Sequence, residues 1–176
     1  MEQDSAHWVF GYGSLIWRPG FDHIDKSPAL LPGAHRRLCI YSYRHRGTEA
    51  QPGLVFGLMP GGSCHGMAFS VAADAWPDVL AYLREREMDR GVYREAHRPV
   101  RLHTGTIVRA LTFVAEANHP QFAGRLTLED QVRFIRQGVG ESGANSDYVL
   151  ATATHLNALG IRDRNLDRLV KALGTL

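Results

Sequence analysis

Cysteine is scarce in this chain, which has only Cys39 and Cys64 among its 176 residues. The two form no Cys-x-x-Cys pair, and two cysteines cannot supply the disulfide framework of a small secreted scaffold. We therefore expect two buried or half-buried thiols in a reducing compartment.

Long hydrophobic runs are also absent, since no stretch reaches the roughly 18 apolar residues of a membrane-spanning helix. The N-terminal segment MEQDSAH carries acidic residues and lacks the apolar centre of a signal peptide. These features predict a cytoplasmic protein that does not bind a membrane.

Lysine is the third scarce residue: Lys26 and Lys171 stand against eighteen arginines, with a formal net charge of +2. The arginines are scattered and form no basic stripe with interleaved aromatic residues, which disfavours a nucleic-acid partner. Because arginine binds carboxylates bidentately, its abundance favours a small acidic ligand.

The chain contains no repeat and no linker, and a hydrophobic content of 44% suits one domain over residues 1–176. Strands are predicted at about 8–12, 34–43, 54–59, 64–71, 98–103 and 106–115, and helices at about 73–88, 127–138, 147–159 and 165–173. Segment 18–33, rich in proline, is predicted as a loop, and PGGS at 60–63 as a hairpin turn. Asp74 is the expected N-cap of the first helix, with Pro77 in its first turn. Antiparallel hairpins followed by clustered helices predict an α+β fold, a sheet or small barrel with flanking helices.

The segment Gly11-Tyr12-Gly13-Ser14 interrupts the first strand with small residues. It lacks the third glycine of a dinucleotide fingerprint and the Gly-Lys-Ser/Thr of a P-loop. Such a turn exposes backbone N–H groups that can bind a carboxylate or a developing oxyanion, and we expect Gly13 to permit close approach and a positive φ. The alternative is a tight turn that packs Tyr12 in the core.

Glu87 is the most unusual acid in the chain. On a helical wheel it falls about 20° from Trp76, within the apolar face that includes Val79 and Leu83, whereas Glu85 falls about 180° away. Burial and the C-terminal end of the helix dipole both raise the pKa of such a carboxyl toward the range of a general base. The alternatives are a helix that frays before Glu87, or an arginine partner such as Arg37 or Arg90.

Other candidates are weaker. The nine histidines show no metal-ligand spacing, and Ser14 is not in a Gly-x-Ser-x-Gly elbow. Segment 140–149 is a glycine-rich loop entering a helix, where Ser146 is a possible N-cap and Tyr148 could form the polar wall of a pocket.

Three motifs taken together resemble the ChaC family of γ-glutamylcyclotransferases: VFGYGSLIW near the N-terminus, REM followed by GVY at 86–93, and SGANSDYV at 142–149. The resemblance runs from about Trp8 to Leu173 and implies a small mixed β-barrel with flanking helices. It departs from some relatives at Val92, between Gly91 and Tyr93, and in the LCIYS segment at 38–42.

The resemblance implies cleavage of glutathione to 5-oxoproline and cysteinylglycine, without metal or organic cofactor. It implies Glu87 as the catalytic residue. It also implies a set of substrate-binding residues, namely Val9, Phe10, Gly11, Tyr12, Gly13, Ser14, Leu15 and Tyr148. Arg37 is also expected among the substrate-binding residues. For the second carboxylate of glutathione, Arg37, Arg44 and Arg46 are the nearest candidates by motif order, and the sequence does not distinguish among them.

Two other functions stay open at this point. The protein could cyclise other γ-glutamyl amines or dipeptides, or it could be a non-catalytic regulator that binds a γ-glutamyl group. In each case the expected partner is a small molecule, and no obligate protein partner is evident.

Overall fold

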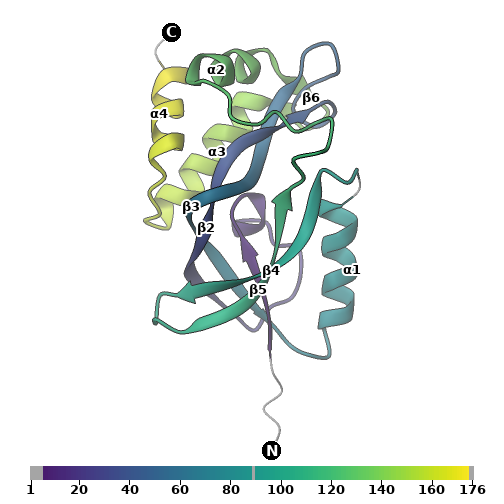
Figure 1. Cartoon of the computed structure of the whole chain (residues 1–176), viewed down its shortest axis with the longest axis vertical. Coiled ribbons are helices and arrows are strands. Elements are labelled where there is room, and N and C mark those ends of the chain that lie inside the picture. Colours follow the sequence, from purple (N-terminus) through teal and green to yellow (C-terminus); the bar gives the residue numbers. More distant parts are fainter. Residues whose placement is uncertain (1–5, 89, 175–176) are drawn as a thin grey trace, which may run out of the picture. The chain divides into compact units, whose positions relative to one another are not determined.

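The structure of the protein is a computed structural model that describes residues 6–88 and 90–174. Residues 1–5, on which the prediction about a signal peptide depends, lie outside the described residues. The elements in chain order are β1 (His7–Gly11), the 3-10 helix η1 (Ser14–Ile16), β2 (Asp25–Ser42), β3 (Gly53–Val71), α1 (Trp76–Glu87), β4 (Tyr93–Leu102), β5 (Ile107–Ala115), α2 (Leu128–Gln137), β6 (Val139–Gly140), β7 (Gly143–Ala144), α3 (Asn145–Ala158) and α4 (Arg164–Leu173) (Figure 1). Among the described helices, none is both long enough and apolar enough to cross a membrane.

Five strands close into a barrel in the order β1-β3-β2-β4-β5. β1 is antiparallel to β3 and parallel to β5, and β4 is antiparallel to both β2 and β5. The prediction of an α+β fold with a small mixed barrel is therefore confirmed.

The contacts divide the chain into two compact units. Unit 1 comprises Met1–Arg36 and Leu58–Glu116, and unit 2 comprises Arg37–Gly57 and Ala117–Leu176. Unit 1 holds β1, β4, β5 and α1, and unit 2 holds the last three helices. That residues 1–176 act as a single domain stays a prediction.

The core of unit 1 forms between the barrel strands and α1. It is a cluster of buried apolar side chains, namely Val9, Leu15, Val71, Val79, Leu83, Leu111 and Phe113. The predicted apolar face of α1 is confirmed, since Val79 and Leu83 are buried and Trp76 and Leu80 pack against the cluster. Pro77 lies in the first turn as predicted, but the N-cap is Ala75 and not Asp74, because the helix begins later than expected.

The predicted hairpin at PGGS is wrong, because β3 runs unbroken from Gly53 to Val71. Gly61 and Gly62 adopt positive φ values of 98° and 66°, which bends the strand without reversing it. The His35 Nδ1 atom lies 2.9 Å from the Gly61 carbonyl oxygen and keeps this part of β3 beside β2.

The predicted loop over 18–33 is also wrong in its second half, because β2 begins at Asp25. Ala29 and Leu30 pair with Leu102 and Arg101 of β4, and no further rung is recorded between the two strands in the described residues. Pro28 and Pro32 flank this short ladder, as expected for residues that have no N–H to donate.

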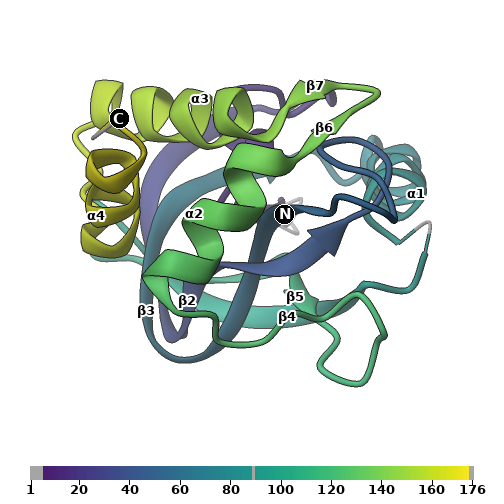
Figure 2. The ribbon, with the colours of Figure 1, turned by 90° about the horizontal axis from the view of Figure 1, so that it is seen from above.

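Unit 2 is built around α2, α3 and α4, which all contact one another (Figure 2). The Thr127 hydroxyl accepts a hydrogen bond from the Asp130 amide at 3.1 Å, so the predicted cap of α2 is confirmed. Gly160, with a φ of 69°, follows the end of α3 as predicted. The short pair β6–β7 was not predicted, because two-residue strands leave no periodicity to detect.

Candidate active site

The turn after β1 is tight because Gly11 lacks a side chain. A Cβ atom at Gly11 would lie 2.9 Å from the Leu15 Cβ, too close for two carbon atoms. Tyr12 is buried, and its hydroxyl donates a hydrogen bond of 2.8 Å to the Phe113 carbonyl. The side chain of Tyr12 thus packs in the core, as one of the two alternatives predicted.

The side chains of the neighbouring motif residues Val9, Phe10 and Leu15 are likewise buried. Val9 and Leu15 belong to the apolar cluster beneath α1. The parts of the motif that remain for a ligand are therefore its backbone, Gly13 and Ser14.

Gly13 lies beside open space. The residue is buried, yet a Cβ atom placed on it would meet no heavy atom within 4 Å. Its φ is −136°, so the prediction of a positive φ at Gly13 is wrong. Within the part of the chain that the structure describes, the amide groups of Gly13, Ser14 and Leu15 are assigned no hydrogen bond. These N–H groups can donate hydrogen bonds to a carboxylate or to a carbonyl oxygen.

Arg36 holds the motif in place and was missed by the sequence analysis. It is buried, its Nε donates to the Tyr12 carbonyl at 2.5 Å, and its Nη2 donates to the His65 carbonyl at 2.6 Å. Strand alternation could have found it, because Arg36 shares a face with the buried residues Ala34 and Leu38.

Glu87 is the last residue of α1, and 18% of its side chain is exposed. Burial raises the pKa of the Glu87 carboxyl above its usual value, and the positive charge of Arg86 lowers it in part. Glu85 is exposed, as the helical wheel predicts. Of the alternatives, fraying before Glu87 is wrong, and the ion-pair partner is Arg86, with 3.4 Å between its Nε and the Glu87 Oε1.

Arg86 links the turn at Ser14 to Glu87, and the sequence analysis also missed this residue. Its Nη2 donates to the Ser14 Oγ at 2.9 Å, while its Nε faces Glu87. One guanidinium thus contacts both the glycine-containing turn and the largely buried acid, two motifs more than seventy positions apart in the chain.

In unit 2, Tyr148 lies in the first turn of α3. Its hydroxyl accepts a hydrogen bond from the Phe56 amide at 3.1 Å, and the Arg46 guanidinium lies 5.4 Å from the centre of its ring. Asn145 is fully buried and pairs with both backbone groups of Leu54, at 2.8 Å to the N–H and 2.7 Å to the carbonyl. Asn145 therefore anchors the start of α3 to β3 and fixes the position of Tyr148 within this unit.

Arg37, also in unit 2, has donor capacity to spare. Its Nη2 donates to the Leu126 carbonyl at 2.8 Å, whereas its buried Nε has no hydrogen-bond partner among the described residues. Burial and the nearby positive charge of Arg125 lower the pKa of the Arg37 guanidinium. Arg44, by contrast, is paired with Glu141 at 2.8 Å.

The described residues contain no group of three or more His, Cys, Asp or Glu side chains that could hold a metal ion. Within the part of the chain that the structure describes, Cys39 and Cys64 form no disulfide, and both are buried, as predicted. Burial raises the pKa of the Cys39 thiol to about 12, so this group is protonated at neutral pH and is a poor nucleophile.

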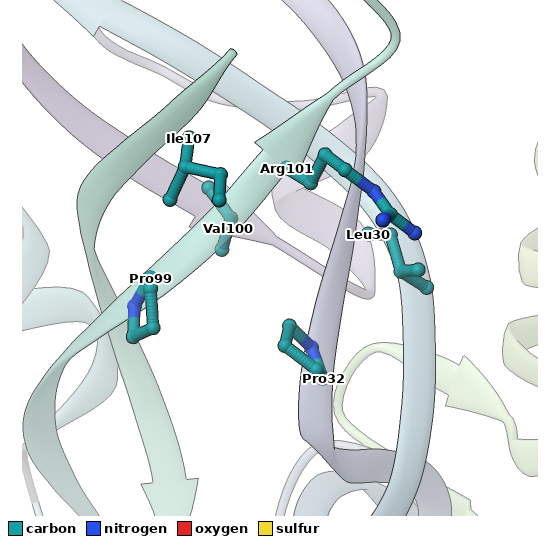
Figure 3. A pocket seen from close by; sticks show the side chains of 6 residues that line it. All are labelled: Leu30, Pro32, Pro99, Val100, Arg101 and Ile107. Atoms are coloured by element: carbon teal, nitrogen blue, oxygen red, sulfur yellow. The ribbon is translucent and has the colours of Figure 1, made fainter. Parts of the chain in front are cut away.

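A separate apolar cavity of about 230 Å³ opens where β2 and β4 diverge (Figure 3). Its lining residues are Leu30, Pro32, Pro99, Val100, Arg101 and Ile107. None of the predicted site residues lines it.

The fold and the candidate site thus combine a closed barrel with a largely buried acid that an arginine links to a glycine-containing turn. The chain belongs to the ChaC-like protein family, whose family model matches residues 7–176.

Several relatives share about a third of their residues with this chain. The glutathione-specific gamma-glutamylcyclotransferase of Escherichia coli (strain K12) is 30% identical over 169 residues, which cover 96% of this chain and 73% of that protein. The protein of the same name from Schizosaccharomyces pombe is 33% identical, covering 94% and 90%. Glutathione-specific gamma-glutamylcyclotransferase 1 of Homo sapiens is 32% identical, covering 97% and 80%.

The fold matches that of a solved structure, a gamma-glutamyl cyclotransferase specific to glutathione from yeast. The TM-score is 0.87 at 23% identity, and the match covers 96% of each chain. This likeness establishes the shared fold.

Proposed function

We propose that this protein is a γ-glutamylcyclotransferase that degrades glutathione to 5-oxoproline and cysteinylglycine. Membership of the ChaC-like family supports the proposal, as do relatives named glutathione-specific gamma-glutamylcyclotransferase. The observation that carries it is the Glu87 carboxyl, which is largely buried at the end of α1 and is linked through Arg86 to the turn at Ser14.

The reaction is intramolecular. The α-amine of the γ-glutamyl group attacks its own γ-carbonyl carbon, a new C–N bond closes a five-membered ring, and the bond to the cysteinyl nitrogen breaks. No water is consumed, and the released cysteinylglycine amine takes up the proton that the attacking amine loses. Because both reacting groups belong to one molecule, correct positioning supplies much of the acceleration, with effective molarities on the order of 10⁵–10⁸ M.

Glu87 is the proposed proton carrier. It accepts a proton from the α-ammonium group and returns one to the leaving nitrogen. The raised pKa of its carboxyl favours both roles, because a carboxyl that holds a proton more readily can return that proton to the leaving nitrogen.

The turn at residues 11–15 is the proposed cradle for the γ-glutamyl group. The open space beside Gly13 and the amide groups of Gly13, Ser14 and Leu15 support a contact with a carboxylate or the carbonyl oxygen. The side chains of Val9, Phe10 and Tyr12 are buried, so their proposed part is to shape the turn.

Arg37 is the proposed ligand of the second carboxylate, on the glycine of glutathione. The like charge of Arg125 nearby supports this role, because two guanidinium groups favour a bound anion. Tyr148 is the proposed wall of the substrate site. We further propose that the enzyme works in the cytoplasm without cofactor.

Cyclisation of other γ-glutamyl amines is the competing activity. The relatives from Arabidopsis thaliana are named gamma-glutamylcyclotransferase without reference to glutathione. The glutathione-specific names of the relatives from four vertebrates, a yeast and a bacterium do not favour this alternative or a non-catalytic role.

Incubation of the purified protein with reduced glutathione in H₂¹⁸O tests the proposal. We expect equal amounts of 5-oxoproline and cysteinylglycine, with no ¹⁸O in the 5-oxoproline. Formation of ¹⁸O-labelled glutamate instead would identify a hydrolase, and absence of any product would favour a binding protein.

A further inference from the structure

The Arg86 guanidinium makes more hydrogen bonds than an ordinary ion pair on a protein surface. Its Nη1 donates to the Arg18 carbonyl at 2.6 Å, to the Pro19 carbonyl at 3.1 Å and to the Tyr82 hydroxyl at 3.0 Å. Its Nη2 donates to the Ser14 Oγ at 2.9 Å. Only 20% of the side chain is exposed, and the bonds to Pro19, Tyr82 and Ser14 are partly shielded from water.

The segment that Arg86 binds is the continuation of the glycine-containing turn. Ser14 opens η1, and Arg18 and Pro19 follow its end. Gly20, with a φ of 74°, lets the chain pass over the Tyr82 hydroxyl, since a Cβ atom there would lie 2.0 Å from that oxygen. The planar fork of arginine can span such a set of acceptors, whereas lysine cannot.

We propose that Arg86 is a positioning residue that holds the Ser14 turn and the Glu87 carboxylate in one fixed geometry for the reaction. The inference rests on the proposed function and extends it, because Arg86 touches Ser14 and Glu87 while neither donating nor accepting the transferred proton. The planar guanidinium of Arg86 fixes the segment from Ser14 to Pro19. Its positive charge favours the ionised form of Glu87, which is the form that can accept a proton.

The electrostatic part of this role follows from the groups around the last turn of α1. Arg86 lies closest to the Glu87 carboxylate, at 3.4 Å. On the same helix, Arg84 is engaged with Glu95 of β4, and Glu85 is exposed. The apolar cluster that α1 covers contributes Met88, Tyr82 and Tyr93 at its margin. Loss of the Arg86 charge would remove the effect that partly offsets the rise in the Glu87 pKa caused by burial.

The test compares Arg86→Gln and Arg86→Lys with the matched control Arg84→Gln. The control removes the same charge from the same helix two residues earlier, at a side chain that is 54% exposed. Two measurements are made on each protein: kcat and KM for glutathione as a function of pH, and the titration of the Glu87 carboxyl by carbon-13 NMR without substrate.

For Arg86→Gln we expect kcat/KM at pH 7 to fall about 10- to 100-fold, as for the loss of charge-assisted hydrogen bonds. The acid limb of the kcat profile and the titration midpoint of Glu87 should both move to higher pH. Arg86→Lys keeps the charge but not the fork, so it should raise KM while leaving the acid limb near that of the unmodified protein. Arg84→Gln should change neither.

An Arg86→Gln protein with the same Glu87 titration and KM as Arg84→Gln would overturn the proposal. So would an Arg86→Lys protein with unchanged KM, because it would show that the fork is not needed. If Arg86→Gln does not fold, Arg86→Lys still tests the fork. If the unmodified protein makes no 5-oxoproline, the proposed function fails, whereas the NMR titration still decides whether Arg86 controls Glu87.

Discussion

The environment of the Glu87 carboxyl disfavours its charged form, and this affects the stability of the folded protein as well as catalysis. Burial raises the pKa of the group in the folded protein, whereas in the unfolded chain it titrates near the usual value of about 4.3. Between these two pKa values and above them, ionisation of Glu87 therefore costs folding free energy.

The Glu87→Gln protein should be more stable than the unmodified protein at pH 7. Glutamine keeps the shape and never ionises, so it avoids the cost of the buried charge. The stabilising contribution of neutral Glu87 is complete below the unfolded pKa and is lost as pH rises through the folded pKa, so the difference should vanish below about pH 4. Denaturant unfolding at both pH values measures it. A less stable Glu87→Gln protein at pH 7 would show that the Arg86 ion pair outweighs burial.

Substitution by alanine should lower the stability of the protein at Gly11, whereas at Gly13 it should weaken substrate binding. Gly11→Ala forces a Cβ against Leu15 and should lower the free energy of unfolding by about 1–3 kcal/mol. Gly13→Ala meets no atom and should change it by less than about 0.5 kcal/mol, while raising KM because the new methyl occupies the substrate space. Unchanged KM in a folded Gly13→Ala protein would show that the substrate lies elsewhere.

At the scale of elements, strong periodicity and end signals predicted the structure well. The apolar stripe of α1 and the Thr127 cap of α2 are both where the sequence places them. The largest errors in element assignment fall on β2 and β3, where proline and glycine normally indicate turns. There, pairing with neighbouring strands overrides the local signals, and neither the partners nor their register can be read from one strand alone.

Asn145 gives a test at this scale, because it joins two elements through one amide. Asn145→Ala would leave the N–H and carbonyl of Leu54 without their side-chain partner in a fully buried position. We expect a loss of about 2–4 kcal/mol in the free energy of unfolding. Asn157→Ala, on an exposed part of the same helix, is the control and should be nearly neutral. Equal stabilities for the two variants would contradict the anchoring role of Asn145.

At the scale of the whole molecule, the sequence predicted the acid and the turn but not what links them. Glu87 stood out because a carboxylate on an apolar face is unusual. Arg86 lies at the margin of that face, and an arginine there is ordinarily interpreted as a solvent-exposed charge. Its hydrogen bonds to Arg18, Pro19 and Ser14 depend on tertiary packing and leave no mark in local spacing.

Substrate choice is the prediction that belongs to the complete protein. We expect kcat/KM to be higher for reduced glutathione than for γ-Glu-Ala or γ-Glu-Cys, which lack its glycine carboxylate. Binding of that remote group can be used to position the γ-glutamyl arm, so a truncated substrate should lose kcat as well as affinity. Arg37→Gln should reduce the ratio of kcat/KM for glutathione to kcat/KM for either dipeptide. Equal kcat/KM values for all three substrates would indicate a broader cyclotransferase.

The central claim is that Glu87 carries the proton in the cyclisation of glutathione, and turnover of the Glu87→Gln protein tests it most directly. With purified protein and no added metal, the unmodified enzyme should release 5-oxoproline, as should the control Glu85→Gln. Glu87→Gln should bind glutathione with nearly unchanged affinity and lose at least about 10²- to 10⁴-fold in kcat, the range of general acid–base catalysis. A folded Glu87→Gln protein that binds glutathione and keeps substantial turnover would contradict the account.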